Sequence, residues 1–380
     1  MIANQLQQLD HKKLALAGTV GALALALSLF YQSYCRRRSK AAASAVPIFT
    51  LGSVISRDGT VVGYRKFCSG GRSSSSSSSS AEQKPTVVAL HGGMQASQNF
   101  VKLAEALSDE FTVIVPDRRG RGMSGPYPDN DEKEEEGDKR SRRTPLQSDC
   151  EDVEALLRET GARHVFALSS GAVIAMQTAV LFPNAMRKLV LYEPPYFIDD
   201  SHPAYAGNWI RVYEDYLSRG DLASALATVI RSVEPGPWIL RIMIPTWIMA
   251  SLLRFFVMKS NGEIKDEGGQ TRAREEQRLQ VPIEALVPTF HYDAQIVMEA
   301  RGNIERFKGI RAQVLLLGGS KSPAYLKDAL GRLEKVIPKV RRVELRGENH
   351  VAAANDGNPV RVANELRKFF SEREGGEEKH

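Results

Sequence analysis

The stretch His164-Val-Phe-Ala-Leu-Ser169-Ser170-Gly171-Ala172-Val173 joins a short apolar run to a segment with helical periodicity through a serine-containing turn. The apolar run predicts a strand that ends at Leu168, and the periodic segment predicts a helix at Ala172–Phe182. A serine at such a junction has two interpretations. It is either the N-cap of the helix or a nucleophile exposed by a sharp turn between strand and helix.

The chain on both sides of this junction alternates short apolar runs with helical segments. The runs predict strands at Val61–Phe67, Thr86–Leu90, Phe111–Val115, His164–Leu168, Lys188–Tyr192, Gln313–Leu317 and Arg342–Leu345. Helical periodicity predicts helices at Asn99–Leu107, Pro145–Glu159, Ala172–Phe182, Ala324–Val336 and Pro359–Phe370. This alternation is typical of a mostly parallel central sheet with helices on both faces. We therefore expect an α/β fold.

One long stretch breaks the alternation. Between Pro195 and about Ile310 no convincing strand pattern occurs, and helical segments dominate. We therefore expect a helical cap at residues 196–310, inserted after strand six between the two parts of the core. The first part of the core would span 46–195, and the second part, with a polar C-terminal tail, would span 311–380.

Four segments resemble the active-site loops of the α/β-hydrolase superfamily and occur in the superfamily's order. Ala167–Gly171 is similar to the nucleophile elbow G-x-S-x-G, with alanine in place of the first glycine. Leu90–Met94 resembles the oxyanion loop, and Pro116–Gly125 resembles the loop after the fourth strand, which is structural in the family. Leu345–Val351 lies where the superfamily supplies its catalytic histidine.

The resemblance implies a role for each of four residues. Ser169 would be the nucleophile, His350 the general base, and Gly93 and Ser170 the residues whose backbone N–H groups bind the oxyanion. A serine nucleophile implies acyl transfer through a covalent acyl-enzyme, with no cofactor and no metal. Haloalkane dehalogenase and epoxide hydrolase chemistry is excluded, because both need an aspartate on the elbow.

The catalytic acid departs from the superfamily's usual pattern. After the seventh strand, Ser322 occupies the position where an aspartate usually stands. Some members, haloalkane dehalogenases among them, carry the acid at the end of strand six, where this chain has Glu193. Glu193 is therefore the first candidate to orient His350, and Asp199 and Asp200 are weaker candidates. The alternative is that Glu193 is a buried glutamate that holds neighbouring loops.

The N-terminal residues 1–45 predict a membrane anchor with a basic flank. Leu14–Cys35 contains no charged side chain and approaches the roughly 20 residues that span a bilayer. Aromatic residues near its end and a basic cluster at 36–40 favour a single-pass anchor with the catalytic domain in the cytosol, at the endoplasmic reticulum. A cleaved signal peptide or a mitochondrial leader is the alternative.

The net charge of +6 does not predict a nucleic-acid-binding groove. Residues 1–40 hold six Lys and Arg side chains against Asp10 alone, so nearly all of the excess positive charge lies in one terminal segment. The three cysteines, Cys35, Cys68 and Cys150, match neither a disulfide framework nor a metal-ligand spacing. The segments 73–80, 129–143 and 260–277 have the composition of solvated surface insertions.

The expected cap suggests a lipophilic ligand. It contains all three tryptophans, Trp209, Trp238 and Trp247, and the apolar stretch Trp238–Met258. Such a cap would cover an apolar cleft or lie in the membrane interface, unless its apolar residues only pack the fold. We therefore expect a membrane-anchored serine hydrolase that cleaves a hydrophobic carboxylic ester or thioester. The alternative is a non-hydrolytic member of the superfamily that binds or reshapes a lipophilic small molecule.

Overall fold

Alternate side chains along the central strands face two different apolar clusters. In β5 (His164–Leu168), Val165 and Ala167 belong to one cluster, and Phe166 and Leu168 belong to the other. This is the two-residue repeat of an extended chain. Because both sets of side chains are buried, helices must cover the sheet on both faces.

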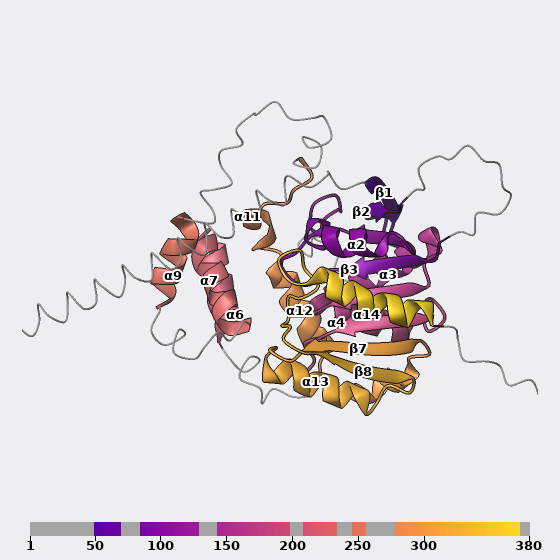
Figure 1. Ribbon diagram of the computed structural model, residues 1–380. Coiled ribbons are helices and arrows are strands. Elements are labelled where there is room, and N and C mark those ends of the chain that lie inside the picture. Colours follow the sequence, from indigo (N-terminus) through magenta and orange to yellow (C-terminus); the bar gives the residue numbers. More distant parts are fainter. Residues whose placement is uncertain are drawn as a thin grey trace, which may run out of the picture. The chain divides into compact units, whose positions relative to one another are not determined.

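The structure, a computed structural model, describes residues 49–69, 84–128, 143–197, 208–233, 245–255 and 278–372. In these residues one eight-stranded sheet has the order β1-β2-β4-β3-β5-β6-β7-β8 (Figure 1). Seven of these strands run in one direction and only β2 runs in the opposite direction, so the α/β fold with a mostly parallel sheet is confirmed. Besides β5, the strands are β1 Phe49–Ile55, β2 Val61–Phe67, β3 Thr86–Leu90, β4 Thr112–Pro116, β6 Lys188–Tyr192, β7 Gln313–Gly319 and β8 Val340–Leu345.

Strand β1 was not among the predicted strands. It lies at the edge of the sheet, and Val54 is its one buried residue. An edge strand with a largely exposed surface has no strict apolar alternation, so its sequence carries a weak strand signal. Its pairing along the whole length of β2 is what makes it extended.

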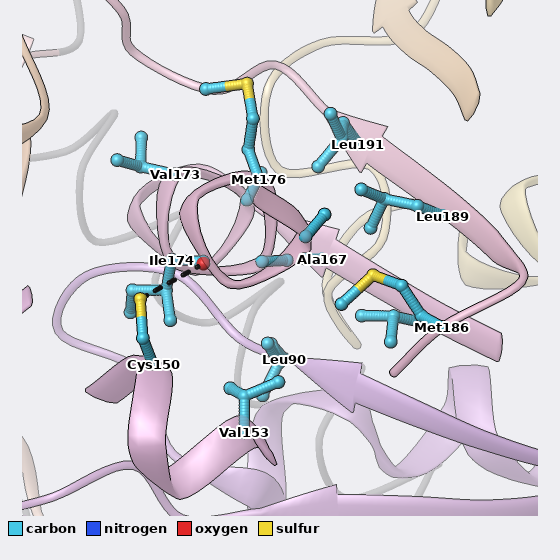
Figure 2. Close-up of a cluster of buried hydrophobic side chains, with 14 of the residues drawn as sticks. Leu90, Cys150, Val153, Ala167, Val173, Ile174, Met176, Met186, Leu189 and Leu191 are labelled. Carbon is cyan, nitrogen blue, oxygen red and sulfur yellow. Dashed lines mark hydrogen bonds between the residues drawn. The ribbon is translucent and has the colours of Figure 1, made fainter. Parts of the chain in front are cut away.

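Helices cover both faces of the sheet, as predicted. The short helix η1 (Ser97–Phe100), α2 (Val101–Leu107) and α14 (Pro359–Ser371) contribute to the cluster on one face. On the other face lie α3 (Pro145–Thr160), α4 (Ser170–Leu181) and α13 (Ala324–Glu334). Figure 2 shows part of this second cluster, where residues of α3 and α4 pack against β3, β5 and β6.

The described residues between β6 and β7 form helices and no strand. These helices are α6 Trp209–Ser218, α7 Leu222–Val233, α9 Thr246–Leu253, α11 Ile283–Leu286, α12 Phe290–Ala300 and η4 Ile304–Gly309. Helix α12 packs against α3 and α4, and its residues Ile296 and Ala300 join the main core cluster. This packing places the first turns of α12 next to the end of β5, where the candidate site lies.

Several predictions concern residues outside the described ranges. They include the anchor at 1–45, Asp199, Asp200, Trp238, and most of the three polar insertions. In the part of the chain that the structure describes, no helix has the length and apolar character needed to cross a bilayer.

Candidate active site

Ser169 lies in a strained turn between β5 and α4. Its backbone has φ 55° and ψ −125°, a conformation that a non-glycine residue adopts at a cost of about 1–3 kcal/mol. The residues around the turn are small because the backbone passes close to the loop after β3. A Cβ atom at Gly171 would lie 2.4 Å from the carbonyl oxygen of His91. Ala167, which replaces the first glycine of the family motif, is fully buried in the core cluster.

We expect Gly171→Ala to lower the free energy of unfolding by about 1–3 kcal/mol or more. The new methyl group would meet a backbone oxygen, which cannot move aside as a flexible side chain can. Urea unfolding followed by circular dichroism measures the effect. Gly309→Ala is the matched control, since no atom lies within 4 Å of a Cβ built at Gly309. Equal unfolding midpoints for the two variants would contradict the prediction.

Gly93 and Ser170 line the same cavity as Ser169. Among the described residues, no acceptor is hydrogen-bonded to the backbone N–H of either residue. Met94, which follows Gly93, has φ 49° and is a second non-glycine residue in the left-handed region. The two N–H groups are therefore free to bind an oxyanion that forms next to Ser169.

Glu193 and His350 are brought together by the ends of neighbouring strands. Glu193 follows β6 with φ 48°, and its Oε2 lies 2.7 Å from Nδ1 of His350. Its Oε1 accepts a hydrogen bond of 2.6 Å from the backbone N–H of Gly319, at the end of β7. The Tyr192 hydroxyl donates to the carbonyl of Asn349, 2.8 Å away, which holds the histidine loop. The buried carboxylate can thus keep the proton of His350 on Nδ1 and leave Nε2 as a base.

The other sequence-predicted positions have different surroundings. In the described part of the chain, no hydrogen bond joins Ser169 to His350, and the buried hydroxyl of Ser322 has no hydrogen-bond partner. Asp117 accepts from the backbone N–H groups of Ser97 (2.7 Å) and Met123 (3.0 Å), the bracing role expected for that loop.

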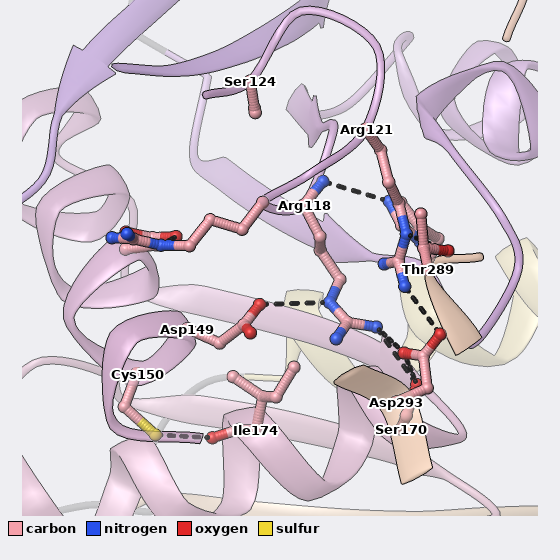
Figure 3. Close-up of polar contacts among 12 residues, drawn as sticks. Arg118, Arg121, Ser124, Asp149, Cys150, Ser170, Ile174, Thr289 and Asp293 are labelled. Atoms are coloured by element: carbon pink, nitrogen blue, oxygen red, sulfur yellow. Dashed lines mark hydrogen bonds and ion pairs between the residues drawn. The ribbon is translucent and has the colours of Figure 1, made fainter. Parts of the chain in front are cut away.

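One residue of the site was missed by the sequence reasoning. Asp293, in the first turn of α12, lines the same cavity as Ser169 and is almost completely buried. Figure 3 shows its carboxylate facing the guanidinium groups of Arg118 and Arg121. Its Oδ1 lies 2.8 Å from Nη1 of Arg118, and its Oδ2 lies 2.6 Å from Nη2 of Arg121. A signal for it does exist in the sequence. Asp293 shares the buried side of its helix with Ile296 and Ala300, at a spacing where an apolar residue is expected.

The charges around Asp293 determine the protonation of two buried groups. Burial would raise the pKa of Asp293, but the nearby cations Arg121 and Arg118 outweigh it and hold the pKa below the ordinary 3.8. Burial and the same two arginines lower the pKa of His91 well below 6.5, so this imidazole is neutral. Its Nδ1 lies 2.9 Å from the carbonyl oxygen of Gly92, and its Nε2 accepts from the backbone N–H of Arg118.

The lowered pKa of Asp293 predicts a loss of stability in acid. The carboxylate is ionised more readily in the folded chain than in the unfolded chain, so its contribution to stability is complete only above a pH of about 5. The contribution is lost as the pH falls further, towards the folded-state pKa. We expect the urea midpoint to fall between about pH 5 and pH 2, and to fall less steeply in Asp293→Asn. An equal or steeper dependence in the variant would contradict this prediction.

The cavity next to Ser169 has a volume of about 80 Å³ and a mainly apolar wall. Among the described residues on this wall, Asp293 is the only carboxylate, and its two oxygens pair with Arg118 and Arg121. In the described ranges, no group of three or more His, Cys, Asp or Glu side chains is placed to bind a metal. The apolar residues of the wall are Pro195, Phe197, Trp209, Ile210, Phe290, Ala294, Val297, Met298 and Tyr325.

Comparison with known proteins identifies one family and several similar structures. A family profile described as "alpha/beta hydrolase fold" matches residues 85–355. An alpha/beta hydrolase from Sphaerobacter thermophilus is 25% identical, covering 84% of this chain and 100% of that chain, with a TM-score of 0.59. An esterase from Rhodococcus sp. ECU1013 is 18% identical, covering 84% and 98%, with a TM-score of 0.51. A membrane phospholipase A described as a bacterial virulence factor is 18% identical, covering 94% and 98%, with a TM-score of 0.52.

Proposed function

This chain belongs to the alpha/beta hydrolase family, and from that premise we propose that it is a serine hydrolase that cleaves a hydrophobic carboxylic ester or thioester. The observation that carries the proposal is the position of Ser169. This serine lies in a strained strand-to-helix turn and opens into a cavity with a mainly apolar wall. Gly93 and Ser170, whose backbone N–H groups have no acceptor in the described part of the chain, line the same cavity.

The proposed reaction has two steps with a covalent intermediate. The Oγ of Ser169 attacks the carbonyl carbon while Nε2 of His350 takes the hydroxyl proton. The resulting oxyanion accepts hydrogen bonds from Gly93 and Ser170, each worth on the order of 3 kcal/mol in the transition state. His350 then gives its proton to the leaving alcohol or thiol. A water molecule, deprotonated by His350, releases the acid and restores Ser169.

The substrate class follows from the lining of the cavity. An acyl chain next to Ser169 would contact aromatic and aliphatic side chains, and Asp293, the one carboxylate among the described lining residues, is already paired with arginines. Exposed Trp247 (69%) and Phe255 (61%), on or just after α9, supply further apolar surface of the kind found at membrane interfaces. Together with the apolar run Leu14–Cys35, they support attachment to a membrane. The basic cluster at 36–40 supports a catalytic part on the cytosolic side.

Hydrolysis of p-nitrophenyl esters of increasing acyl length tests the proposed substrate class. The full-length protein in detergent is expected to show a kcat/KM that rises at least about tenfold from the acetate to a medium-length acyl chain, because each added buried methylene contributes about 0.8 kcal/mol. A matching series of acyl thioesters compares the two leaving groups. A kcat/KM that is highest for the acetate would contradict a hydrophobic substrate.

The alternative function is non-hydrolytic binding of a lipophilic small molecule in the same cavity. It is favoured by the lack of a hydrogen bond between Ser169 and His350 among the described residues and by a serine at the usual acid position, Ser322. Labelling with a fluorophosphonate probe distinguishes the two functions, because an unactivated serine does not react with it. We expect stoichiometric labelling at Ser169. An unlabelled protein that also lacks turnover would favour the binding function.

A further inference from the structure

Asp293 connects the helical insertion to both segments that would supply oxyanion donors. Its Oδ1 accepts a hydrogen bond of 2.9 Å from the Ser170 hydroxyl, and its Oδ2 accepts one of 3.2 Å from the backbone N–H of Met94. Ser170 carries one of the two free N–H groups, and Met94 directly follows Gly93, which carries the other. A single carboxylate on α12 therefore holds two loops that come from the ends of β3 and β5.

The carboxylate also packs directly on Gly93. A Cβ atom built at Gly93 would lie 3.2 Å from the Cγ and Oδ2 atoms of Asp293. A Cβ atom built at Gly92 would lie 3.0 Å from the Cβ atom of Ser169. The peptide between Gly92 and Gly93 is thus confined between the turn that contains Ser169 and the side chain of Asp293. Confinement of this kind keeps a backbone N–H in one orientation before the substrate arrives, which is what electrostatic stabilisation of a transition state requires.

Two arginines make a buried carboxylate possible at this place. Arg118 donates from Nη1 to Oδ1 of Asp293 and to the Ser170 hydroxyl, and its Nε lies 3.3 Å from Asp149. Arg121 donates from Nη2 to Oδ2 of Asp293 and from Nε to the Thr289 hydroxyl. Their positive charges offset that of Asp293, which alone would repel an oxyanion forming nearby. Figure 3 shows this arrangement.

We propose that Asp293 is a positioning residue that preorganises the oxyanion hole, so that docking of the helical insertion completes the catalytic site. The proposal rests on the serine-hydrolase function above and assigns a role in it to a residue outside the nucleophile, base and acid. Asp293 itself does not touch the reacting atoms. Its effect reaches them through Met94 and Ser170.

The test compares Asp293→Asn with the matched control Asp149→Asn in the full-length protein. Both replace a buried carboxylate that binds Arg118, but only Asp293 contacts Met94 and Ser170. For Asp293→Asn we expect kcat to fall about 10- to 100-fold with KM changed less than about threefold, since donors that act only in the transition state affect kcat. The dissociation constant of a trifluoromethyl ketone, whose adduct with Ser169 places an oxyanion in the same hole, should rise by a similar factor. Asp149→Asn should change kcat less than about threefold.

Two results would overturn the role of Asp293. One is a kcat of Asp293→Asn within about threefold of the wild type, measured where circular dichroism shows both proteins folded. The other is an equal loss in Asp149→Asn, which would trace the effect to a disturbed Arg118. If Asp293→Asn does not fold, the kcat of Ser170→Ala tests the role of Asp293 instead. This variant removes the hydroxyl that donates to Asp293 and keeps the backbone N–H of residue 170. We expect its kcat to fall about three- to tenfold, and an unchanged kcat would overturn the proposal.

The same experiment separates this proposal from the function on which it rests. A wild-type protein that neither hydrolyses any ester nor reacts with a fluorophosphonate would remove the serine-hydrolase function and the role of Asp293 with it. An active wild type together with an unaffected Asp293→Asn would remove only the role of Asp293.

Discussion

Replacing Ser169 with alanine is expected to lower kcat for ester hydrolysis by at least about 10⁴-fold. The substitution removes the atom that forms the acyl-enzyme, and only the oxyanion donors and substrate binding remain to accelerate the reaction. It removes one hydroxyl and introduces no new group into the cavity, so the free energy of unfolding should change by less than about 1 kcal/mol. Steady-state kinetics on the best p-nitrophenyl ester and urea unfolding measure the two effects.

A second serine serves as the control for Ser169→Ala. Ser148 is fully buried in α3, and its hydroxyl has no hydrogen-bond partner among the described residues. Ser148→Ala should keep both the turnover and the fluorophosphonate labelling of the wild type. If Ser169→Ala is still labelled or still turns over ester at a rate within tenfold of the wild type, the nucleophile is another residue.

Replacing Glu193 with glutamine is expected to lower kcat by about 10³- to 10⁴-fold. The Oε1 atom would still accept from the N–H of Gly319, so the new amide group would point its N–H at Nδ1 of His350. An N–H group can face Nδ1 only when that nitrogen carries no proton. The proton of a neutral His350 then resides on Nε2, the atom that must accept the proton of Ser169. The loss therefore comes from the wrong tautomer and leaves the fold intact.

Glu348→Gln is the control for this effect. Glu348 lies two residues before His350, but its carboxylate accepts from Arg361 and Asn358. In the described ranges no hydrogen bond or ion pair joins it to the imidazole. It should keep kcat within about threefold of the wild type. A similar kcat for the two glutamine variants would mean that Glu193 only holds neighbouring loops, the alternative that the sequence left open.

The parallel core and the strand-to-helix turn at Ser169 were readable from local sequence. Strands such as β3 and β5 are short and almost wholly apolar. A buried strand has this apolar composition regardless of its neighbours in the fold, so it can be recognised from local sequence. The turn at Ser169 requires small neighbours and a glycine at position 171. These residues lie within ten positions of one another, so the turn can also be predicted from local sequence. Strand β1 was missed because an edge strand depends on its partner more than on its own residues.

The partner of His350 required the tertiary structure. The sequence ranked Glu193, at the end of strand six, ahead of Asp199 and Asp200, but it left open whether Glu193 only holds neighbouring loops. The parallel pairing of β6 with β7 places Glu193 beside Gly319 and 2.7 Å from an imidazole 157 residues further along the chain. The distance between two residues so far apart in the sequence depends on the order of the strands and on the left-handed backbone conformation of Glu193. Local sequence predicts neither.

The position of Asp293 likewise required the tertiary structure. In the sequence it is one acidic residue in a helical segment, 123 residues from Ser170, and its arginine partners belong to a loop interpreted as structural. Local sequence determines which segments can form a tight strand-to-helix turn and which can place alternate side chains on the two faces of a sheet, because those properties depend on neighbours along the chain. The placement of a carboxylate against two backbone loops depends instead on how an inserted helix packs on the core, and that is decided by the burial of side chains brought from far apart.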